Sequence, residues 1–324
     1  MTISPPTEAL AAFAADIRLG LGKAQKALPA QYFYDDLGSQ LFEAICQLPW
    51  YPITRAEKRL LERYAAAMVA PLGTIADLVE LGSGSGEKLA TVAAAIPATQ
   101  APRGKLPVHL IDISEKALEL SRSNLGRLPY LEVHSHRETY EAGLQSLSEG
   151  RAKEGARLVL FLGSNIGNFD RSSAERLLSE VRRALRPGDG LLLGADLVRS
   201  EADLVLAYDD PLGVTAAFNK NLLVRMNREL GADFDLDAWK HRAVFSAKES
   251  RVEMHLVSRR PQRVRVPGAG IEASFAEGET IWTESSYKYT EDSVASLGER
   301  VGLRRRDQWI EPEGCFSTTL FVVA

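Results

Sequence analysis

The sequence predicts an α/β protein: a doubly wound, Rossmann-like parallel sheet with a second, smaller α+β part. Short apolar runs of strand length alternate with amphipathic helical stretches through the middle of the chain. A glycine-rich turn joins one of these runs to a helix, as in ligand-binding doubly wound sheets. After Asp196 the alternation stops, and the following residues are first helix-rich and then strand-like.

The predicted elements follow one another in the order that such a sheet requires. Arg55–Val69 repeats apolar residues at helical spacing, and Ile75–Leu81 is a short apolar run that ends in glycines. The strand Val108–Ile113 is followed by a helix over Glu115–Leu125, for which Ser114 is the expected N-cap. The remaining predicted elements are a strand at Leu158–Leu162, a helix at Ser172–Leu185, a strand at Gly190–Ala195, a helix at Thr290–Val301 and closing strands around Trp309 and Thr318–Val323.

We therefore expect two parts, each made from two segments of the chain. The sheet, which would bind a cofactor, comprises residues 57–198 and 289–324. The smaller part, which would recognise the substrate, comprises residues 1–56 and 199–288. Its first segment is aromatic and rich in turns, which is typical of a cap and not of a sheet core.

Composition and charge exclude several classes of protein. The 324 residues include 39 Lys and Arg against 43 Asp and Glu, a formal net charge of −4, without the basic excess that phosphate binding needs. Residues 1–10 lack the basic and apolar segments of a signal peptide, and no apolar run is long enough to span a membrane. We expect a cytoplasmic monomer that binds neither nucleic acid nor a membrane.

No metal ion is expected. Cys46 and Cys315 are the only cysteines, show no paired zinc-type spacing, and are expected to be buried thiols. His134 and His136 alternate as residues on one face of a strand do, which favours a surface role over metal binding. Residues 233–237 resemble the start of a calcium loop but lack its later glycine and acidic ligand, so they predict a turn or a helix cap.

The glycine turn Gly82–Gly86 follows a predicted strand, where nucleotide-like ligands dock in open α/β sheets. Asp112 ends the next strand and suits two ribose hydroxyls. The turn matches neither the dinucleotide pattern nor the P-loop. Glu80 beside it would repel a pyrophosphate but tolerate a sulfonium and an amino group. These residues favour S-adenosylmethionine over NAD or ATP; the alternative is a plain tight turn without a ligand.

Several short blocks, most of them outside the generic sheet, are more specific than the glycine turn. They are Tyr34–Ser39, Leu81–Gly84, Phe161–Asn168, Ala207–Asp210, Phe218–Asn221 and Thr283–Ser286. With them the chain, from about residue 30 to its C-terminus, resembles the histidine Nα-methyltransferases of ergothioneine biosynthesis. The resemblance implies an S-adenosylmethionine methyltransferase sheet. It also implies that L-histidine is converted in three transfers to its trimethyl betaine, hercynine, with release of S-adenosylhomocysteine.

The resemblance implies that Asn168 and Tyr208 bind the carboxylate of histidine and that Tyr34 lies near its amine, so these three are the catalytic candidates. Neutral donors orient a carboxylate without a cation that would oppose the nearby sulfonium. The amine must lose its proton before it attacks. Tyr34 is suited to orient a water that accepts this proton, although an unperturbed phenol is itself a weak base.

The resemblance implies that Tyr51, Glu284 and Ser286 bind the imidazole, with Met254 beside the pocket. A carboxylate accepts from one ring N–H while a hydroxyl serves the other nitrogen, so a purely apolar side chain would leave buried polar groups unpaired. The cofactor-binding candidates are Gly82, Gly84, Lys88, Asp112, Thr139, Tyr140 and Gly163. Thr139 departs from the family, which usually has an acidic residue there against the adenine.

Two rival functions remain at this stage. The first is the same chemistry on another substrate, such as tryptophan, tyrosine or a related amine, against which Glu284 and Met254 argue. The second is a non-catalytic, ligand-binding relative that kept the fold, because a fold alone does not establish chemistry. Tyr34, Tyr51 and Tyr208 also have a purely structural interpretation as partly buried aromatics with satisfied hydroxyls.

Overall fold

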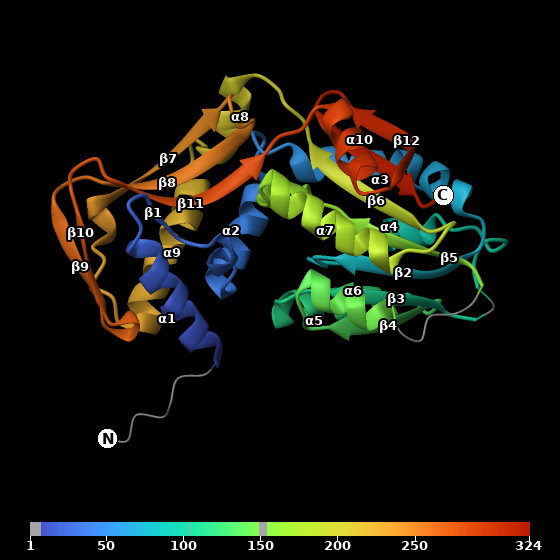
Figure 1. The fold of residues 1–324 in the computed structure, drawn as a ribbon, viewed down its shortest axis with the longest axis horizontal. Coiled ribbons are helices and arrows are strands. Elements are labelled where there is room, and N and C mark those ends of the chain that lie inside the picture. Colours follow the sequence, from blue (N-terminus) through green and yellow to red (C-terminus); the bar gives the residue numbers. More distant parts are fainter. Residues whose placement is uncertain (1–7, 103, 149–153) are drawn as a thin grey trace. The chain divides into compact units, whose positions relative to one another are not determined.

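The computed structural model describes residues 8–102, 104–148 and 154–324, and the chain divides into two units (Figure 1). The sheet unit comprises Ile53–Val198 and Tyr287–Ala324, and the second unit comprises the residues up to Pro52 together with Arg199–Ser286. Residues 1–7, which belong to the segment examined for a signal peptide, lie outside the described residues. The functions expected of the two parts stay predictions.

The sheet unit contains a seven-stranded sheet with the strand order β12-β13-β6-β5-β2-β3-β4. Its strands are β2 (Ile75–Leu81), β3 (Leu106–Ile111), β4 (Leu131–His136), β5 (Ala156–Phe161), β6 (Gly190–Asp196), β12 (Arg304–Glu311) and β13 (Phe316–Val322). The strands from β6 to β4 run parallel, whereas β13 runs antiparallel to both of its neighbours. The expectation of an entirely parallel sheet was therefore wrong at this edge. A short hairpin connects β12 to β13, and such a connection imposes antiparallel pairing.

Helices cover both faces of this sheet. In chain order they are α3 (Ile53–Val69), α4 (Glu87–Ala94), α5 (Glu115–Leu125), α6 (Tyr140–Ser148), α7 (Arg171–Ala184) and α10 (Glu291–Arg300), with the short 3-10 helices η2 (Ala70–Leu72) and η3 (Asn165–Asn168). Helix α4 packs against both α3 and α5, and α7 packs against both α6 and α10. The main apolar core joins residues such as Val79, Phe161 and Leu191 of the sheet to Leu177 of α7 and Leu297 of α10. The predicted α/β fold is confirmed.

Local signals explain where these elements begin and end. Every residue of β2 is buried, as expected of a strand covered on both faces, and its five apolar residues are interrupted only by Asp77 and Glu80. Helix α5 has the predicted bounds, and the side chain of Ser114 accepts from the backbone N–H of Ala117 at 3.2 Å. Helix α10 begins at a capping box in which Thr290 and Ser293 satisfy each other's backbone N–H groups.

The second unit is built on a four-stranded sheet, β1-β11-β8-β7, with a separate hairpin β10-β9 (Figure 1). Its strands are β1 (Lys26–Ala27), β7 (Trp239–Ser246), β8 (Arg251–Ser258), β9 (Gln262–Val266), β10 (Ile271–Phe275) and β11 (Thr280–Tyr287). Its helices are α1 (Glu8–Leu21), η1 (Ala30–Phe33), α2 (Asp36–Gln47), α8 (Glu201–Tyr208), α9 (Val214–Leu230), η4 (Leu236–Ala238) and η5 (Pro267–Ala269). Helices α8 and α9 pack on β7 and β8, and α2 packs on α9.

Minor expectations have mixed outcomes. Cys46 is a buried free thiol, but Cys315 is partly exposed because it lies in the turn between β12 and β13 with φ of 48°. The segment 233–237 is a turn and cap, as predicted, since the side chain of Asp235 accepts from the N–H of Asp237 at the start of η4. His134 lies on β4, where its ring stacks on that of His109 with centroids 5.0 Å apart.

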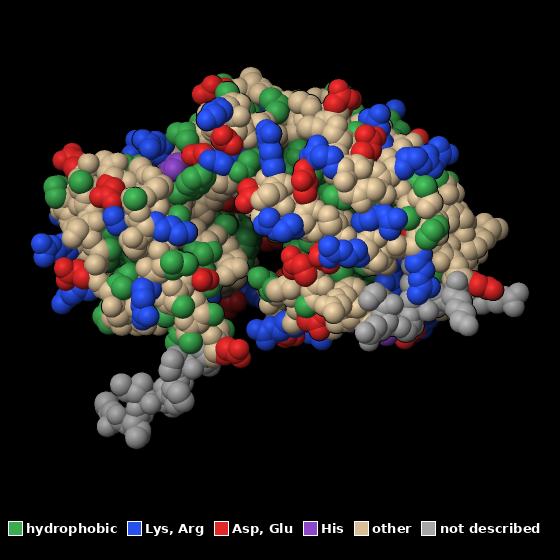
Figure 2. Space-filling model, viewed as in Figure 1, with side chains coloured by type: hydrophobic (Ala, Val, Ile, Leu, Met, Phe, Trp, Pro, Cys, Tyr) green, Lys and Arg blue, Asp and Glu red, His purple; other side chains and the backbone are tan. Residues whose placement is uncertain are grey.

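The described part of the chain lacks two features, a membrane-spanning helix and a metal-binding cluster. Within residues 8–102, 104–148 and 154–324, no helix combines the length and the hydropathy that a membrane crossing requires. The same residues contain no group of three or more His, Cys, Asp or Glu arranged to hold a metal ion. Figure 2 shows Lys and Arg interspersed with Asp and Glu over the visible face, in keeping with the nearly balanced composition.

Candidate functional site

The glycine turn lies at the carboxyl end of β2, between β5 and β3, where the strand order of the sheet reverses direction. Gly82, Gly84 and Gly86 all have positive φ, at 80°, 50° and 74°. A Cβ added to Gly82 would lie 2.8 Å from both the side-chain nitrogen of Asn165 and the hydroxyl of Tyr140. The turn therefore needs glycine for its conformation and for the close approach of these side chains.

Asp112 follows β3 and faces this turn. One of its carboxylate oxygens accepts from the N–H of Ser83 at 3.0 Å, and the other accepts from the N–H of Ser114 at 2.8 Å. Burial raises the pKa of Asp112, while these backbone hydrogen bonds oppose that rise. The carboxylate is thus fixed beside the glycine turn, with lone pairs left for hydroxyl donors such as those of a ribose.

A buried ionic contact ties three elements of the sheet unit together. Glu57 of α3 is fully buried, and both of its carboxylate oxygens accept from the backbone N–H of Gly163, at 2.8 and 2.9 Å. The ammonium of Lys88 on α4 lies 2.5 Å from the same carboxylate. A Cβ at Gly163, which has φ of 76°, would lie only 3.1 Å from that ammonium. Two predicted cofactor-binding residues therefore share one partner, Glu57, which the sequence analysis missed.

Glu80 is the third acidic group in this region, after Asp112 and Glu57. It is buried at the end of β2, and one of its carboxyl oxygens has no hydrogen-bond partner among the described residues. Burial raises the pKa of Glu80 to about 8, Lys88 lowers it, and the neighbouring carboxylates Glu57 and Asp112 raise it further. Because the group is largely protonated at neutral pH, it repels a pyrophosphate less than the sequence suggests.

Thr139 and Tyr140 stand where helix α6 begins. Thr139 is exposed, and its hydroxyl accepts from the N–H of Ala142 at 3.3 Å, so its described contact is that of a helix cap. The ring of Tyr140 packs edge-on against Phe161 with centroids 5.6 Å apart, and its hydroxyl points at the glycine turn. Tyr140 thus supplies an aromatic wall, whereas an adenine contact through Thr139 stays a prediction.

Asn168 is the remaining site candidate of the sheet unit. It is the last residue of η3 and its side chain is exposed. The turn that leads into η3 is strained at Ser164, which has φ of 56°, and the Ser164 hydroxyl accepts from the N–H of Asp196 at 2.9 Å. The loop that holds Gly163 and Asn168 is therefore fixed at both Glu57 and β6.

The other substrate candidates lie in the second unit, and several of them are in contact. The hydroxyl of Tyr208, at the end of α8, donates to Oγ of Ser286 on β11 at 2.8 Å. The ring of Tyr51 lies edge-on to that of Tyr208, with centroids 6.0 Å apart. Burial raises the pKa of Tyr51 well above its usual value, and the neighbouring Tyr208 and Glu284 raise it further. The phenol of Tyr51 is therefore a neutral hydrogen-bonding group at physiological pH.

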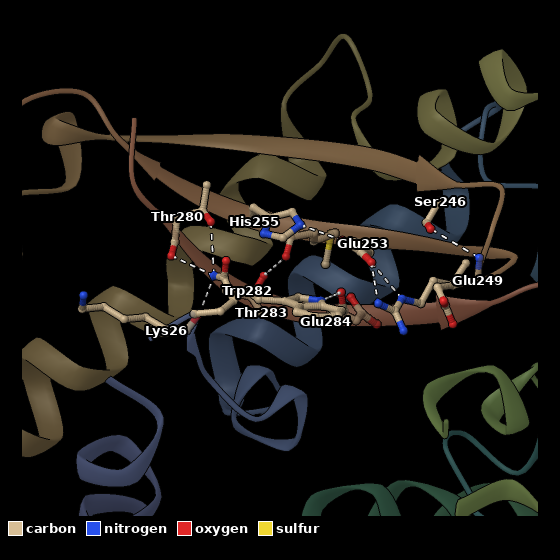
Figure 3. A network of polar contacts seen from close by, with 12 residues as sticks. Lys26, Ser246, Glu249, Glu253, His255, Thr280, Trp282, Thr283 and Glu284 are labelled. Carbon is tan, nitrogen blue, oxygen red and sulfur yellow. Dashed lines mark hydrogen bonds and ion pairs between the residues drawn. The ribbon is translucent and has the colours of Figure 1, made fainter. Parts of the chain in front are cut away.

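Met254 and Glu284 are held by the pairing of β8 with β11 (Figure 3). The hydroxyl of Thr283 donates to the main-chain oxygen of Met254 at 3.0 Å, and the indole of Trp282 donates to that of Glu284 at 2.8 Å. Since side chains alternate along a strand, Glu284 and Ser286 project from the same face of β11, and the buried Thr283 projects from the other.

Tyr34 is exposed, with 40% of its surface accessible. Its ring packs edge-on against Phe42, with centroids 5.6 Å apart, and against Phe218, at 5.8 Å. The next residue, Asp35, is the N-cap of α2 and accepts from the N–H of Gly38 at 2.7 Å. The sequence around Tyr34 therefore fixes its backbone while much of its surface stays accessible.

Comparison with known proteins now adds to this geometry. The chain matches, over residues 13–323, the model of a family described as the SAM-dependent, histidine-specific methyltransferases. The chain belongs to this family. Membership confirms the expected resemblance and establishes a SAM-dependent methyltransferase, in agreement with the strand order and the glycine turn of the sheet unit.

Individual members of the histidine-specific methyltransferase family resemble the chain over nearly its whole length. A histidine N-alpha-methyltransferase of Mycolicibacterium smegmatis is 41% identical, with 95% of this chain and 94% of the relative covered. One of Mycobacterium tuberculosis is 40% identical, with 94% and 93% covered. A more distant relative, an L-tryptophan methyltransferase of Psilocybe serbica, is 25% identical and covers 88% of this chain and 85% of its own.

Proposed function

We propose that this protein transfers methyl groups from S-adenosylmethionine to the α-amine of L-histidine and, in three successive transfers, forms the betaine hercynine of ergothioneine biosynthesis. Family membership supports the reaction class. The two relatives that share 41% and 40% of their residues with the chain are named as histidine N-alpha-methyltransferases, which supports the substrate.

Among the residues of the chain, the hydrogen bond between Tyr208 and Ser286 is the observation that best supports histidine as the substrate. It places two hydroxyls beside the buried phenol of Tyr51 on one side of the second unit's sheet. Glu284 adds a carboxylate on the same strand face as Ser286, and Met254 adds an apolar group. Such a set of one anionic acceptor, neutral hydroxyls and an apolar wall suits an imidazole better than an indole or a phenyl ring.

The residues of the sheet unit fit the proposed cofactor. S-adenosylmethionine carries a carboxylate, an amino group and ribose hydroxyls, and when bound it supplies an electrophilic methyl group. Lys88 offers a cation, the unpartnered oxygen of Glu80 offers a buried acceptor, and Asp112 offers lone pairs to hydroxyls. We assign Gly82, Gly84, Lys88, Asp112, Thr139, Tyr140 and Gly163 to cofactor binding.

The proposed mechanism depends on holding a neutral amine in line with the methyl group. Asn168 and Tyr208 would hold the substrate carboxylate as neutral donors, which fixes the position of the adjacent amine. Tyr34 would lie near that amine and, being exposed, would orient a water that accepts the amine proton. The nitrogen lone pair forms the new N–C bond, and the electrons of the broken C–S bond stay on sulfur.

A competition experiment tests this function. The purified protein is incubated with S-adenosylmethionine and an equimolar mixture of the amino acids, and each amino acid is assayed for added methyl groups by mass spectrometry. We expect histidine to gain three methyl groups and tryptophan and tyrosine to gain none. Preferential methylation of tryptophan or tyrosine would replace the substrate, and absence of any transfer would favour a non-catalytic relative.

A further inference from the structure

The block Phe218–Asn221 singled out in the sequence lies on helix α9, and its Asn219 is fully buried. The side-chain nitrogen of Asn219 lies 2.8 Å from Nδ1 of His241 and donates to the main-chain oxygen of His255 at 3.2 Å. The other ring nitrogen of His241, Nε2, lies 2.7 Å from the main-chain oxygen of Tyr208. A continuous chain of hydrogen bonds therefore leads from α9 to Tyr208.

The two main-chain oxygens, those of His255 and Tyr208, fix the direction of every hydrogen bond in this network. The carbonyl of His255 can only accept, so the amide of Asn219 must present its nitrogen there and to His241. Nδ1 of His241 then accepts and carries no proton. The proton of the neutral ring is on Nε2, which donates to the carbonyl of Tyr208.

Two further observations agree with this assignment. The side-chain oxygen of Asn219 is buried without a hydrogen-bond partner among the described residues, which costs free energy of desolvation. This cost agrees with an amide whose orientation is fixed by the two acceptors of its nitrogen. Burial lowers the pKa of His241, while Asp209 and Asp210 raise it and Lys220 lowers it again. The ring is thus neutral at physiological pH.

We propose that Asn219 and His241 are positioning residues for Tyr208: Asn219 holds His241 as the tautomer protonated at Nε2, and His241 holds the carbonyl of Tyr208. Asp210, which accepts from the N–H groups of Thr215 and Val214, fixes the start of α9 directly after Tyr208. The end of α8 is therefore tied to α9 and to β7, and the Tyr208 hydroxyl is directed at Ser286. This inference rests on the proposed role of Tyr208 in binding histidine.

Three substitutions of His241 separate positioning from simple filling of space. The amide nitrogen of Gln replaces Nε2 of histidine, that of Asn replaces Nδ1 only, and Phe replaces the ring without either. Loss of one buried hydrogen bond corresponds to about a tenfold change in affinity. We expect KM for histidine to rise about tenfold in His241→Asn and His241→Phe but only about twofold in His241→Gln, with the dissociation constant of S-adenosylmethionine unchanged in all three.

The ranking of the variants decides between the two roles. If His241 merely filled space, Phe would preserve KM better than Gln, and that ranking would overturn the proposal. If the Phe variant fails to fold, the tautomer of the native His241 ring still decides, because a ring that only fills space has no reason to carry its proton on Nε2. His134→Gln on β4, a partly exposed position in the sheet unit, serves as the control and should leave KM within about twofold of the parent.

A spectroscopic measurement tests the hydrogen-bond chain without any methyl transfer. Protein labelled with ¹⁵N in its histidine rings gives the tautomer of each ring, and the signals of His241 are identified by their absence in His241→Gln. We expect a neutral ring protonated at Nε2, and a proton on Nδ1 in Asn219→Asp, where a carboxylate replaces the donor. A ring of the native protein protonated at Nδ1, or doubly protonated, would refute the inference. Failure of the protein to methylate histidine would instead count against the proposed function alone.

Discussion

Both carboxylate oxygens of the fully buried Glu57 accept from the backbone N–H of Gly163, at 2.8 and 2.9 Å. The ammonium of Lys88 lies 2.5 Å from the same carboxylate. The first turn of α3 thereby holds the loop after β5 and orients a side chain of α4, and both contacts belong to the proposed cofactor site. Glu57 is thus a positioning residue for Lys88 and Gly163.

Glu57→Gln tests this role. The amide keeps one acceptor for the Gly163 N–H but places a donor beside Lys88, so the ammonium loses its charged partner. We expect the dissociation constant of S-adenosylmethionine, measured by calorimetry, to rise about tenfold. Glu62→Gln, an exposed position on the same helix, is the control and should leave it unchanged. Equal constants for Glu57→Gln and the parent would remove Glu57 from the site.

Glu284→Gln should affect the amino-acid substrate and spare the cofactor. The variant keeps the size of the side chain but loses the anionic acceptor proposed for an imidazole N–H. We expect KM for histidine to rise by about one to two orders of magnitude, with an unchanged dissociation constant for S-adenosylmethionine. Glu272→Gln, which lies on the separate β9–β10 hairpin, is the matched control. Similar losses for both ligands would contradict the assignment of Glu284 to the imidazole.

Glu80→Gln should stabilise the ligand-free protein relative to the parent, and this difference should grow as the pH rises. The pKa of Glu80 is about 8 in the folded protein, against 4.5 as its ordinary value. Between these two pKa values the folded state holds the proton of Glu80 more tightly than the unfolded state does. The contribution of the protonated group to the free energy of unfolding is therefore fully present below pH 4.5 and is lost as the pH rises through about 8. We expect Tm of the variant to exceed that of the parent near pH 8 by several degrees, with little difference near pH 5. A difference independent of pH would contradict the buried, protonated state of Glu80.

Asp35→Asn should weaken the second unit at neutral pH. Although burial raises the pKa of Asp35, hydrogen bonds from Arg228, Gly38 and Asn221 lower it by more, so its folded pKa lies below the usual value. The charged form of Asp35 therefore stabilises the folded protein fully above the ordinary pKa of 3.8. This stabilisation is lost as the pH falls through the lower pKa that Asp35 has in the folded protein. We expect the free energy of unfolding in urea to fall by about 1–2 kcal/mol at pH 7, because Asn keeps the helix N-cap but loses the anionic acceptor of Arg228 and Asn221, and the difference to vanish in strong acid. A persistent difference in acid would show that another contact is responsible.

Much of the sheet unit could be predicted because its signals are local. The strand Ile75–Leu81 and the helix Glu115–Leu125 have the predicted bounds, since one is a mainly apolar run that ends in glycines and the other begins at a capping serine. The two-residue strand β1 was not predicted, because it pairs with β11 far along the chain and is too short to show a pattern. The same reason explains the missed orientation of β13, which depends on its pairing with β6.

The site residues divide in the same way. Gly82 and Asp112 stand beside a strand end and a turn, so the sequence alone indicates their place. Glu57 and His241 give no such signal, because Glu57 acts on Gly163, 106 positions away, and His241 acts on the main chain of Tyr208. Glu57 lies in the apolar stripe of a predicted helix, and a charged residue at such a position is the one signal by which the sequence could have indicated it.

The position of the added methyl groups tests the central claim most directly. Histidine is incubated with the purified protein and S-adenosylmethionine that carries a ¹³C-labelled methyl group, and the product is examined by two-dimensional NMR. The account predicts three equivalent labelled methyl groups on the α-nitrogen and none on the imidazole, because Glu284 and Ser286 would hold the ring while the amine faces the cofactor. Label on a ring nitrogen, or label on another amino acid in preference to histidine, would contradict it.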